Sequence, residues 1–267
     1  MSPITDVEPL VTFDPEALLA LAGPLTPEAD VVHAWAFTLD GSPAFVAACR
    51  ELLSPEERQR ADRYVFEKDR VHHTVAHGVL RHLLARYCGV TPYALRFRMT
   101  ASGKPSLEWP VDSAPAPASR RLHFNLSHSG GRALLGVTDG RELGVDLEHV
   151  RSDVQTLEIS RHYFFGTERA AIENALSAMR DMTFFRYWVA KEAVLKAQGV
   201  GLGFPLDKFC IQFLPDGDRA SIETLDPKVL EPDWTVRMLR CEPGWAAAIV
   251  ARANEWRVKV VTEPRNL

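Results

Sequence analysis

The chain has 267 residues, of which 46% are hydrophobic and 25% are charged, and its formal net charge is -4. This composition is typical of a globular protein long enough for one large domain or two small ones. A chain with this weak negative charge has no global basic field, so we expect no nucleic acid as its main partner.

The cysteines and the N-terminus indicate the compartment. The cysteines form no CxxC pair, which favours reduced thiols, although one bridge would also fit; they are Cys49, Cys88, Cys210 and Cys241. Acidic residues stand in the N-terminal segment where a signal peptide would be basic, and its run LLALAG is too short to span a bilayer. We therefore expect a cytoplasmic protein that does not associate with membranes.

The first third of the chain is predicted to be mainly helical. Residues 1–30 form an extension rich in Pro and Asp, with one short helix expected in PEALLALAG. VVHAWAF (31–37) is predicted as a buried strand, and LDGSPAFVAACRELL as a turn and a helix. Ser54 and Glu57 have the spacing of a capping box, so one or two long helices are expected from there to Gly89.

Strands dominate the middle of the chain. Short strands are predicted at residues 94–99 and after the loop ASGKP, followed by a Pro/Ala/Ser-rich surface connection at 109–121. LHFNLS and RALLGVT are predicted as strands on either side of the turn HSGG. Asp139 and Gly140 are expected to join RALLGVT to ELGVDLE as a β-hairpin, because Asp-Gly supplies the positive φ values of a type I′ turn.

The second half of the chain repeats the layout of the first. Helices are expected at about 153–163, 167–178 and 182–198, followed by the strand segments FCIQFL, SIETL, WTVRML and AAAIVA. The fold class is therefore α+β, with two similar halves at 31–139 and 140–267. A site between such halves would be natural.

Three carboxylates are candidates for a shared site. In GVDLEHV, strand alternation places Asp146 and Glu148 on one face, opposite the apolar residues. In WVAKEAVLK, Trp188, Glu192 and Lys196 fall in one sector of a helix at 100° per residue. Clustered carboxylates repel one another without a cation, and an all-oxygen set suits Mg²⁺. An acid–base carboxylate pair is the competing interpretation, and solvated surface residues would need no function.

Other polar motifs are weaker by themselves. Ser127 and His128 stand where a strand enters a glycine turn, which can hold an anion or simply be capped by the histidine. The sequence lacks the nucleophile elbow G-x-S-x-G, so it does not indicate a hydrolase. The GKP motif lacks the spacing of a phosphate-binding loop. The arginines of the helix after Pro55, Arg60 among them, are either a solvated face or phosphate ligands.

Six motifs in order resemble the surfactin-synthetase type (Sfp-type) of 4′-phosphopantetheinyl transferase: SPEERQRADRY, GKP, FNLSHSGG, GVDLE, FFGTE and WVAKEAVLKAQGVGL. The resemblance covers roughly residues 31–255. It implies an enzyme that transfers the phosphopantetheine arm of coenzyme A to a serine of an apo carrier protein, uses Mg²⁺ and releases 3′,5′-ADP. It also implies a pseudo-dimer of two α+β halves with coenzyme A between them.

The resemblance implies roles for residues of the second half. Asp146, Glu148 and Glu192 match the magnesium ligands, and Lys196 matches a lysine that contacts the transferred phosphate. Glu168 of FFGTE matches a glutamate proposed to help activate the serine, for which Glu192 is the rival candidate. The half at 140–267 would thus carry the metal and the catalytic groups.

The resemblance also implies which residues contact coenzyme A from the first half, which would bind the adenine and the 3′-phosphate. These residues of the first half are Gly103, Lys104, Pro105, Ser127, His128 and Arg60. Lys196 of the second half would contact coenzyme A as well. The GKP loop would flank the adenine, Ser127 and His128 the phosphates, and Arg60 the 3′-phosphate. Glu57 departs from the pattern, because some relatives have a basic residue there.

The expected partners are apo carrier domains of fatty-acid, polyketide or nonribosomal peptide synthases, and we expect a monomer. Two other functions fit the same residues. One is another Mg²⁺-dependent phosphoester enzyme, such as a nucleotide pyrophosphatase. The other is a non-catalytic module that binds carrier domains or coenzyme A.

Overall fold

The computed structural model describes residues 8–100, 103–108, 122–201, 203–224, 233–252 and 255–262. The connection expected at 109–121 and the first seven residues of the N-terminal extension lie outside the described residues.

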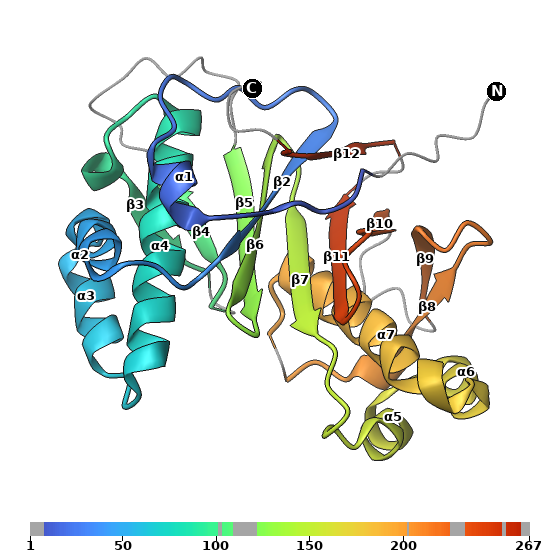
Figure 1. Ribbon diagram of the computed structural model, residues 1–267. Helices are drawn as coiled ribbons and strands as arrows, with labels where there is room; N and C mark the ends of the chain where they lie inside the picture. The colour runs from blue at the N-terminus through green and yellow to red at the C-terminus, as the bar shows by residue number, and fades with distance from the viewer. Residues whose placement is uncertain are drawn as a thin grey trace.

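The first sheet contains strands from both ends of the chain (Figure 1). Its strand β2 (Val31–Thr38) pairs antiparallel with β6 (Arg132–Asp139), which pairs antiparallel with β5 (Leu122–Ser129). The other edge of β2 carries β1 (Thr12–Phe13) and β12 (Arg257–Val260), both parallel to it. The glycine turn between β5 and β6 confirms the predicted strand–turn–strand arrangement around HSGG.

The two ends of the chain cross the expected domain borders. Strand β12 lies within the expected second half but pairs with β2 of the first, and its last residue, Val260, is buried. In the extension, Leu10 donates a 2.8 Å backbone hydrogen bond to Arg240, which precedes β11 of the second sheet. The described part of the extension is therefore integrated into the fold and connects the two sheets.

Helices from the first third of the chain cover one face of the first sheet (Figure 1). Helices α1 (Pro15–Leu19), α2 (Pro43–Leu52) and α4 (Glu67–Cys88) share a core with the sheet, and α3 (Pro55–Asp62) packs against α4. The predicted capping box is present at the start of α3: Ser54 Oγ accepts from Glu57 N, and the Glu57 carboxylate accepts from Ser54 N. The short turn η1 (Pro92–Ala94) leads to a separate hairpin of β3 (Arg96–Met99) and β4 (Pro105–Glu108).

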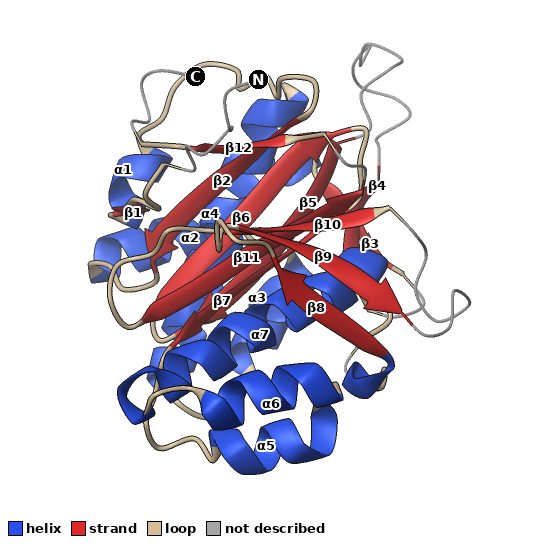
Figure 2. Cartoon of the chain, turned by 90° about the vertical axis from the view of Figure 1, so that its right-hand side faces the viewer, coloured by secondary structure: helices blue, strands red, loops and turns tan. Residues whose placement is uncertain are grey.

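The second half has its own antiparallel sheet and its own helices. The sheet runs in the order β7 (Leu143–His149), β11 (Trp245–Arg252), β10 (Trp234–Met238), β9 (Arg219–Thr224) and β8 (Phe209–Phe213). Its helices are α5 (Thr156–Tyr163), α6 (Gly166–Asn174), α7 (Ser177–Gln198) and the short turn η2 (Leu206–Lys208). Figure 2 shows α5, α6 and α7 together on one side of the strands. Helix α7 begins at Ser177, earlier than the expected Met182.

The expected hairpin at Asp139 and Gly140 is wrong, because β6 and β7 belong to different sheets. Gly140 does turn the chain, with φ of 76°. However, the apolar faces of β6 and β7 pack against each other within the core between the two sheets. A side chain at Gly136 of β6 would overlap Leu143 and Val145 of β7. Face-to-face packing has therefore replaced edge-to-edge pairing.

The predicted α+β fold with two similar halves is confirmed. Each half contributes most of one sheet and one long helix, and both long helices, α4 and α7, have 22 residues. Both end at a left-handed glycine, Gly89 with φ of 67° and Gly199 with φ of 68°. The layers run helices, sheet, sheet, helices, so each half has its own core and a third core lies between the sheets.

The cysteines and the helices bear on two further expectations. All four cysteines are free thiols. In the part of the chain that the structure describes, every helix is too short or too polar to cross a membrane.

Candidate active site

Side chains, not a backbone ladder, connect the facing edges of the two sheets. Strand β5 ends the first sheet and β7 ends the second, and alternate residues of β5 reach across. Asn125 Oδ1 accepts a 2.8 Å hydrogen bond from a backbone N–H of β7. Ser127 Oγ donates to Asp146 Oδ1 at 2.8 Å, and Ser129 Oγ donates to Glu148 Oε2 at 2.5 Å. We call this junction the seam.

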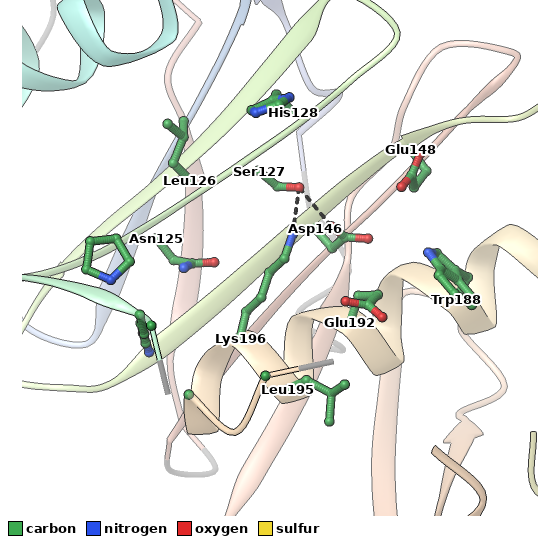
Figure 3. A pocket seen from close by; sticks show the side chains of 15 residues that line it. Asn125, Leu126, Ser127, His128, Asp146, Glu148, Trp188, Glu192, Leu195 and Lys196 are labelled. Atoms are coloured by element: carbon green, nitrogen blue, oxygen red, sulfur yellow. Dashed lines mark hydrogen bonds and ion pairs between the residues drawn. The ribbon is translucent and has the colours of Figure 1, made fainter. Parts of the chain in front are cut away.

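A pocket of about 480 Å³ opens along the seam, between β5, β7, α7 and the start of β4 (Figure 3). Its lining combines three carboxylates, two lysines and a few apolar side chains. The lining residues are Gly103, Lys104, Pro105, Asn125, Leu126, Ser127, His128, Asp146, Glu148, Trp188, Glu192, Leu195, Lys196, Gly199 and Gly201.

Helix α7 forms one wall of the pocket. The predicted sector of Trp188, Glu192 and Lys196 faces the pocket, four residues apart each time. The helix lies unusually close to β7, because Gly144 has no side chain: a Cβ there would overlap the backbone of Ala193 and Ala197. The glycine of GVDLE thus allows the carboxylates of β7 and α7 to share one pocket.

Lys196 occupies the centre of the polar cluster. Its Nζ lies 2.6 Å from Asp146 Oδ1 and 2.8 Å from Ser127 Oγ. The Asp146 side chain is 4% exposed, so its charge is only weakly solvated and needs a nearby cation. Lys196 supplies that cation.

The other two carboxylates have raised pKa values. Burial and then the charge of Asp146 raise the pKa of Glu192 to about 7, and Lys196 partly opposes this shift. Burial also raises the pKa of Glu148, while the hydrogen bond from Ser129 lowers it. Both shifts have the sign expected where negative charges accumulate in a partly dry pocket.

The expected metal cluster is not preformed. Among the residues that the structure describes, no three His, Cys, Asp or Glu side chains are close enough to hold a metal ion together. The carboxylates of Asp146, Glu148 and Glu192 repel one another, and Lys196 holds one oxygen of Asp146. The other oxygen, Oδ2, is buried without a hydrogen-bond partner. An orphaned oxygen beside two further carboxylates fits Mg²⁺ chemically, but closing around the ion requires the side chains to move.

Lys104 ties the first half to the second. Its Nζ donates to the carbonyl of Leu143 at 2.9 Å and to that of Ala197 at 2.8 Å. Leu143 begins β7, and Ala197 lies in the last turn of α7, where the helix dipole favours a cation. Burial lowers the pKa of Lys104 to about 8. The GKP loop is therefore anchored at the pocket by its lysine.

Two predicted site residues lie outside the pocket. Arg60 lines a separate hollow on α3 with Tyr64. Burial and then the charge of Arg60, followed by that of His128, lower the pKa of His73 to about 4. Glu168 is 1% exposed and ion-paired with Lys191 at 2.9 Å. The structure does not bring Glu168 to the cluster of Asp146, Glu148 and Glu192.

Asn125 and Ser129 were not among the predicted site residues. Both lie two residues from Ser127, and strand alternation places them on the same face. That signal was present in FNLSHSGG, but nothing in the sequence showed that β7 would lie opposite.

Comparisons with known proteins match both halves of the chain. Two sequence families match: the 4′-phosphopantetheinyl transferase superfamily over residues 142–250, and the N-terminal region of 4′-phosphopantetheinyl transferases over residues 40–138. The border between the two matches falls between β6 and β7, where the chain changes sheets.

Characterised relatives extend the match over most of the chain. It is 32% identical over 235 residues to the 4′-phosphopantetheinyl transferase HetI of Nostoc sp., covering 88% of this chain and 93% of that protein. It is 30% identical over 200 residues to the 4′-phosphopantetheinyl transferase Sfp of Bacillus subtilis, covering 74% and 82%. It is 29% identical over 191 residues to the human L-aminoadipate-semialdehyde dehydrogenase-phosphopantetheinyl transferase, covering 68% and 60%. The chain therefore belongs to the 4′-phosphopantetheinyl transferase superfamily of enzymes.

Proposed function

We propose that this enzyme transfers the 4′-phosphopantetheine arm of coenzyme A to a serine of an apo carrier protein, requires Mg²⁺, releases 3′,5′-ADP and is of the Sfp type. The observation that carries the proposal is the seam pocket, in which Lys196 bridges Asp146 and Ser127 while Glu192 lies one turn away. Such a site places positive charge and acidic oxygens where a diphosphate would lie.

Coenzyme A would lie along the pocket. The loop of Gly103, Lys104 and Pro105 forms one end and would flank the adenine. Ser127 and His128 would approach the phosphates from β5. Arg60, in the separate hollow on α3, would approach the 3′-phosphate, which a guanidinium can bind with two hydrogen bonds.

The acidic residues and Lys196 would carry the chemistry. Asp146, Glu148 and Glu192 would hold Mg²⁺, which when bound supplies positive charge against the diphosphate. Lys196 would turn from Asp146 toward the phosphate and offset negative charge as the ADP leaves. Glu192, directly or through water, would take the proton of the incoming serine hydroxyl. The partners would be carrier domains of fatty-acid, polyketide or nonribosomal peptide synthases, and the enzyme would act as a monomer.

The test is a transfer assay with coenzyme A, Mg²⁺ and an apo carrier protein, read by mass spectrometry of the carrier. We expect the mass of one phosphopantetheine arm to be added to the carrier. Asp146→Ala should abolish this addition, because the variant loses a proposed metal ligand and the ion-pair partner of Lys196. The variant protein should stay folded. Asp207→Ala, a substitution at a half-exposed residue of η2, is the matched control.

The same assay separates the alternatives. Loss of coenzyme A without any carrier would indicate a nucleotide pyrophosphatase. Binding of coenzyme A without turnover would indicate a binding module. Near-normal transfer by Asp146→Ala in Mg²⁺ buffer would show that the metal ligands are misassigned.

A further inference from the structure

A completely buried ion pair lies behind the pocket wall. Glu168 of α6 and Lys191 of α7 have side chains that are 0% exposed, and Nζ lies 2.9 Å from Oε2. Such a pair is costly to bury unless every remaining polar atom finds a partner. The position of this costly ion pair beside the candidate site suggests that it serves the site.

Every hydrogen-bonding group of the pair has a partner. Lys191 Nζ also donates to the carbonyls of Leu206 at 2.8 Å and Phe209 at 2.7 Å, which uses all three of its donors. Glu168 accepts from the backbone N–H of Ile211 at 2.7 Å and of Phe165 at 3.0 Å. A carboxylate with these partners, out of reach of the pocket, has no route to the proton of a substrate hydroxyl.

The pair connects three segments around the pocket wall. Lys191 directly precedes Glu192, and at 100° per residue their side chains leave α7 in different directions. Lys191 enters the core, 4.1 Å from the ring centroid of Phe209, whereas Glu192 enters the pocket. The carbonyl partners of Lys191 lie on η2 and β8, just beyond the loop whose Gly199 and Gly201 line the pocket.

We propose that Glu168 is a positioning residue, which acts through Lys191 to fix the register of α7 and its following loop so that Glu192 and Lys196 stay directed into the pocket. This inference rests on the proposed function for its kinetic test. In this proposal Glu168 does not accept a proton from the substrate; it holds α7 in place through Lys191.

Three variants test the role. Glu168→Gln and Lys191→Met each leave one unpaired group in the core, and we expect each to lower kcat for arm transfer by about 10²-fold, the cost of a small misplacement of catalytic groups. The KM for coenzyme A should change less, because Ser127 and His128 lie on β5 and outside α7. The double variant, Glu168→Gln with Lys191→Met, removes both charges together. Its kcat should be about tenfold higher than that of either single variant.

Hydrogen exchange by mass spectrometry supplies a second measurement that needs no activity. In both single variants, amides of residues 192–198 and 206–211 should lose protection, while those of β2 and β6 should keep it. Glu173→Gln is the matched control, because Glu173 is also on α6 and ion-paired, with Arg161 at 2.8 Å, but is partly exposed. It should leave both kcat and exchange unchanged.

Three results would overturn the proposal. One is loss of arm transfer both in Glu168→Gln and in the double variant while the amides of α7 keep their protection from hydrogen exchange. Glu168 would then take part in the chemical step. A second is unchanged kcat and exchange in both single variants. A third is loss of amide protection from hydrogen exchange throughout the chain in all three variants. This result would show that the Glu168–Lys191 pair stabilises the whole fold and has no specific effect on α7. If the wild-type enzyme transfers no arm, the proposed function fails, and the exchange measurement still decides the positioning role.

Discussion

Ser129 shows how a single side chain can prepare the site across the seam. Its hydroxyl donates to Glu148 Oε2 at 2.5 Å and accepts from the backbone N–H of His149 at 3.3 Å. The carboxylate of Glu148 is therefore oriented by a residue of the other sheet. Carboxylates that bind metals commonly have such hydrogen-bonded support.

We expect Ser129→Ala to weaken the response to Mg²⁺. Without the hydroxyl, Glu148 loses its orienting partner, and the Mg²⁺ concentration that gives half-maximal transfer should rise by about 10- to 100-fold. Turnover at saturating Mg²⁺ should change less, because all three proposed ligands remain. Titration of the transfer rate with Mg²⁺ measures this, with Ser221→Ala at an exposed position of β9 as the control. An unchanged titration curve would show that Ser129 does not support a metal ligand.

At the scale of elements, the close contact between α7 and β7 determines whether the carboxylates meet. Gly144 precedes Asp146 by two residues on the same face of β7, and α7 lies directly over it. The atoms that a Cβ would meet belong to the backbone of Ala193 and Ala197, which cannot rotate away. The helix would have to move as a unit.

Gly144→Ala should therefore impair both stability and transfer. Overpacking of a close contact typically costs about 1 to 3 kcal/mol in the free energy of unfolding, and outward movement of α7 would also displace Glu192. Urea denaturation and the transfer assay measure the two effects. Gly203→Ala is the matched control, since a Cβ there meets nothing within 4 Å. Wild-type stability and turnover in Gly144→Ala would mean that α7 does not need this glycine.

Local periodicity predicted the elements better than their partners. Alternation in GVDLEHV correctly separated Asp146 from Val145, and the 100° step correctly grouped Glu192 with Lys196, because both properties depend only on nearby residues. The hairpin expected at Asp139 failed because the turn signal is local, whereas pairing depends on which faces are apolar on both strands. Here the apolar faces favoured packing between sheets.

At the scale of the whole molecule, the site depends on contacts between distant segments that no local pattern encodes. Family resemblance placed Glu168 and Glu192 together in function, but the fold puts one in the core with Lys191 and the other in the pocket. The chain ends likewise meet at β2, across 200 residues and more. Such long-range choices are decided by burial of the whole chain.

The first core contains a buried histidine that should make the molecule acid-sensitive. His33 of β2 is 0% exposed, and its Nδ1 lies 2.6 Å from the hydroxyl of Tyr87 on α4, which also accepts from Trp35 Nε1 at 2.9 Å. A neutral imidazole therefore has a hydrogen-bonding partner in the core at Nδ1, while its Nε2 is buried without one. Burial, assisted by the charge of Lys259, lowers the pKa of His33 to about 4.

We expect the free energy of unfolding to fall as the pH falls from about 6.5 to about 4. The pKa of His33 is lower in the folded state than in the unfolded chain, so in this window the unfolded state binds more protons and is favoured. Each unit of pKa difference is worth about 1.4 kcal/mol, so His33 contributes at most about 3.5 kcal/mol of this loss. His73 and His82, whose pKa values burial also lowers to about 4, should add to it.

Urea denaturation between pH 7.5 and pH 4.5 separates the share of His33 from the rest. His33→Gln keeps an acceptor for Tyr87 but does not titrate, so its stability should fall less steeply with acid than that of the wild type, even if it is lower at pH 7.5. His162→Gln, at an exposed position on α5, should keep the wild-type slope. Equal slopes for the wild type and His33→Gln would place the acid sensitivity elsewhere, because a histidine that stays neutral in the core must contribute to the difference in protons bound.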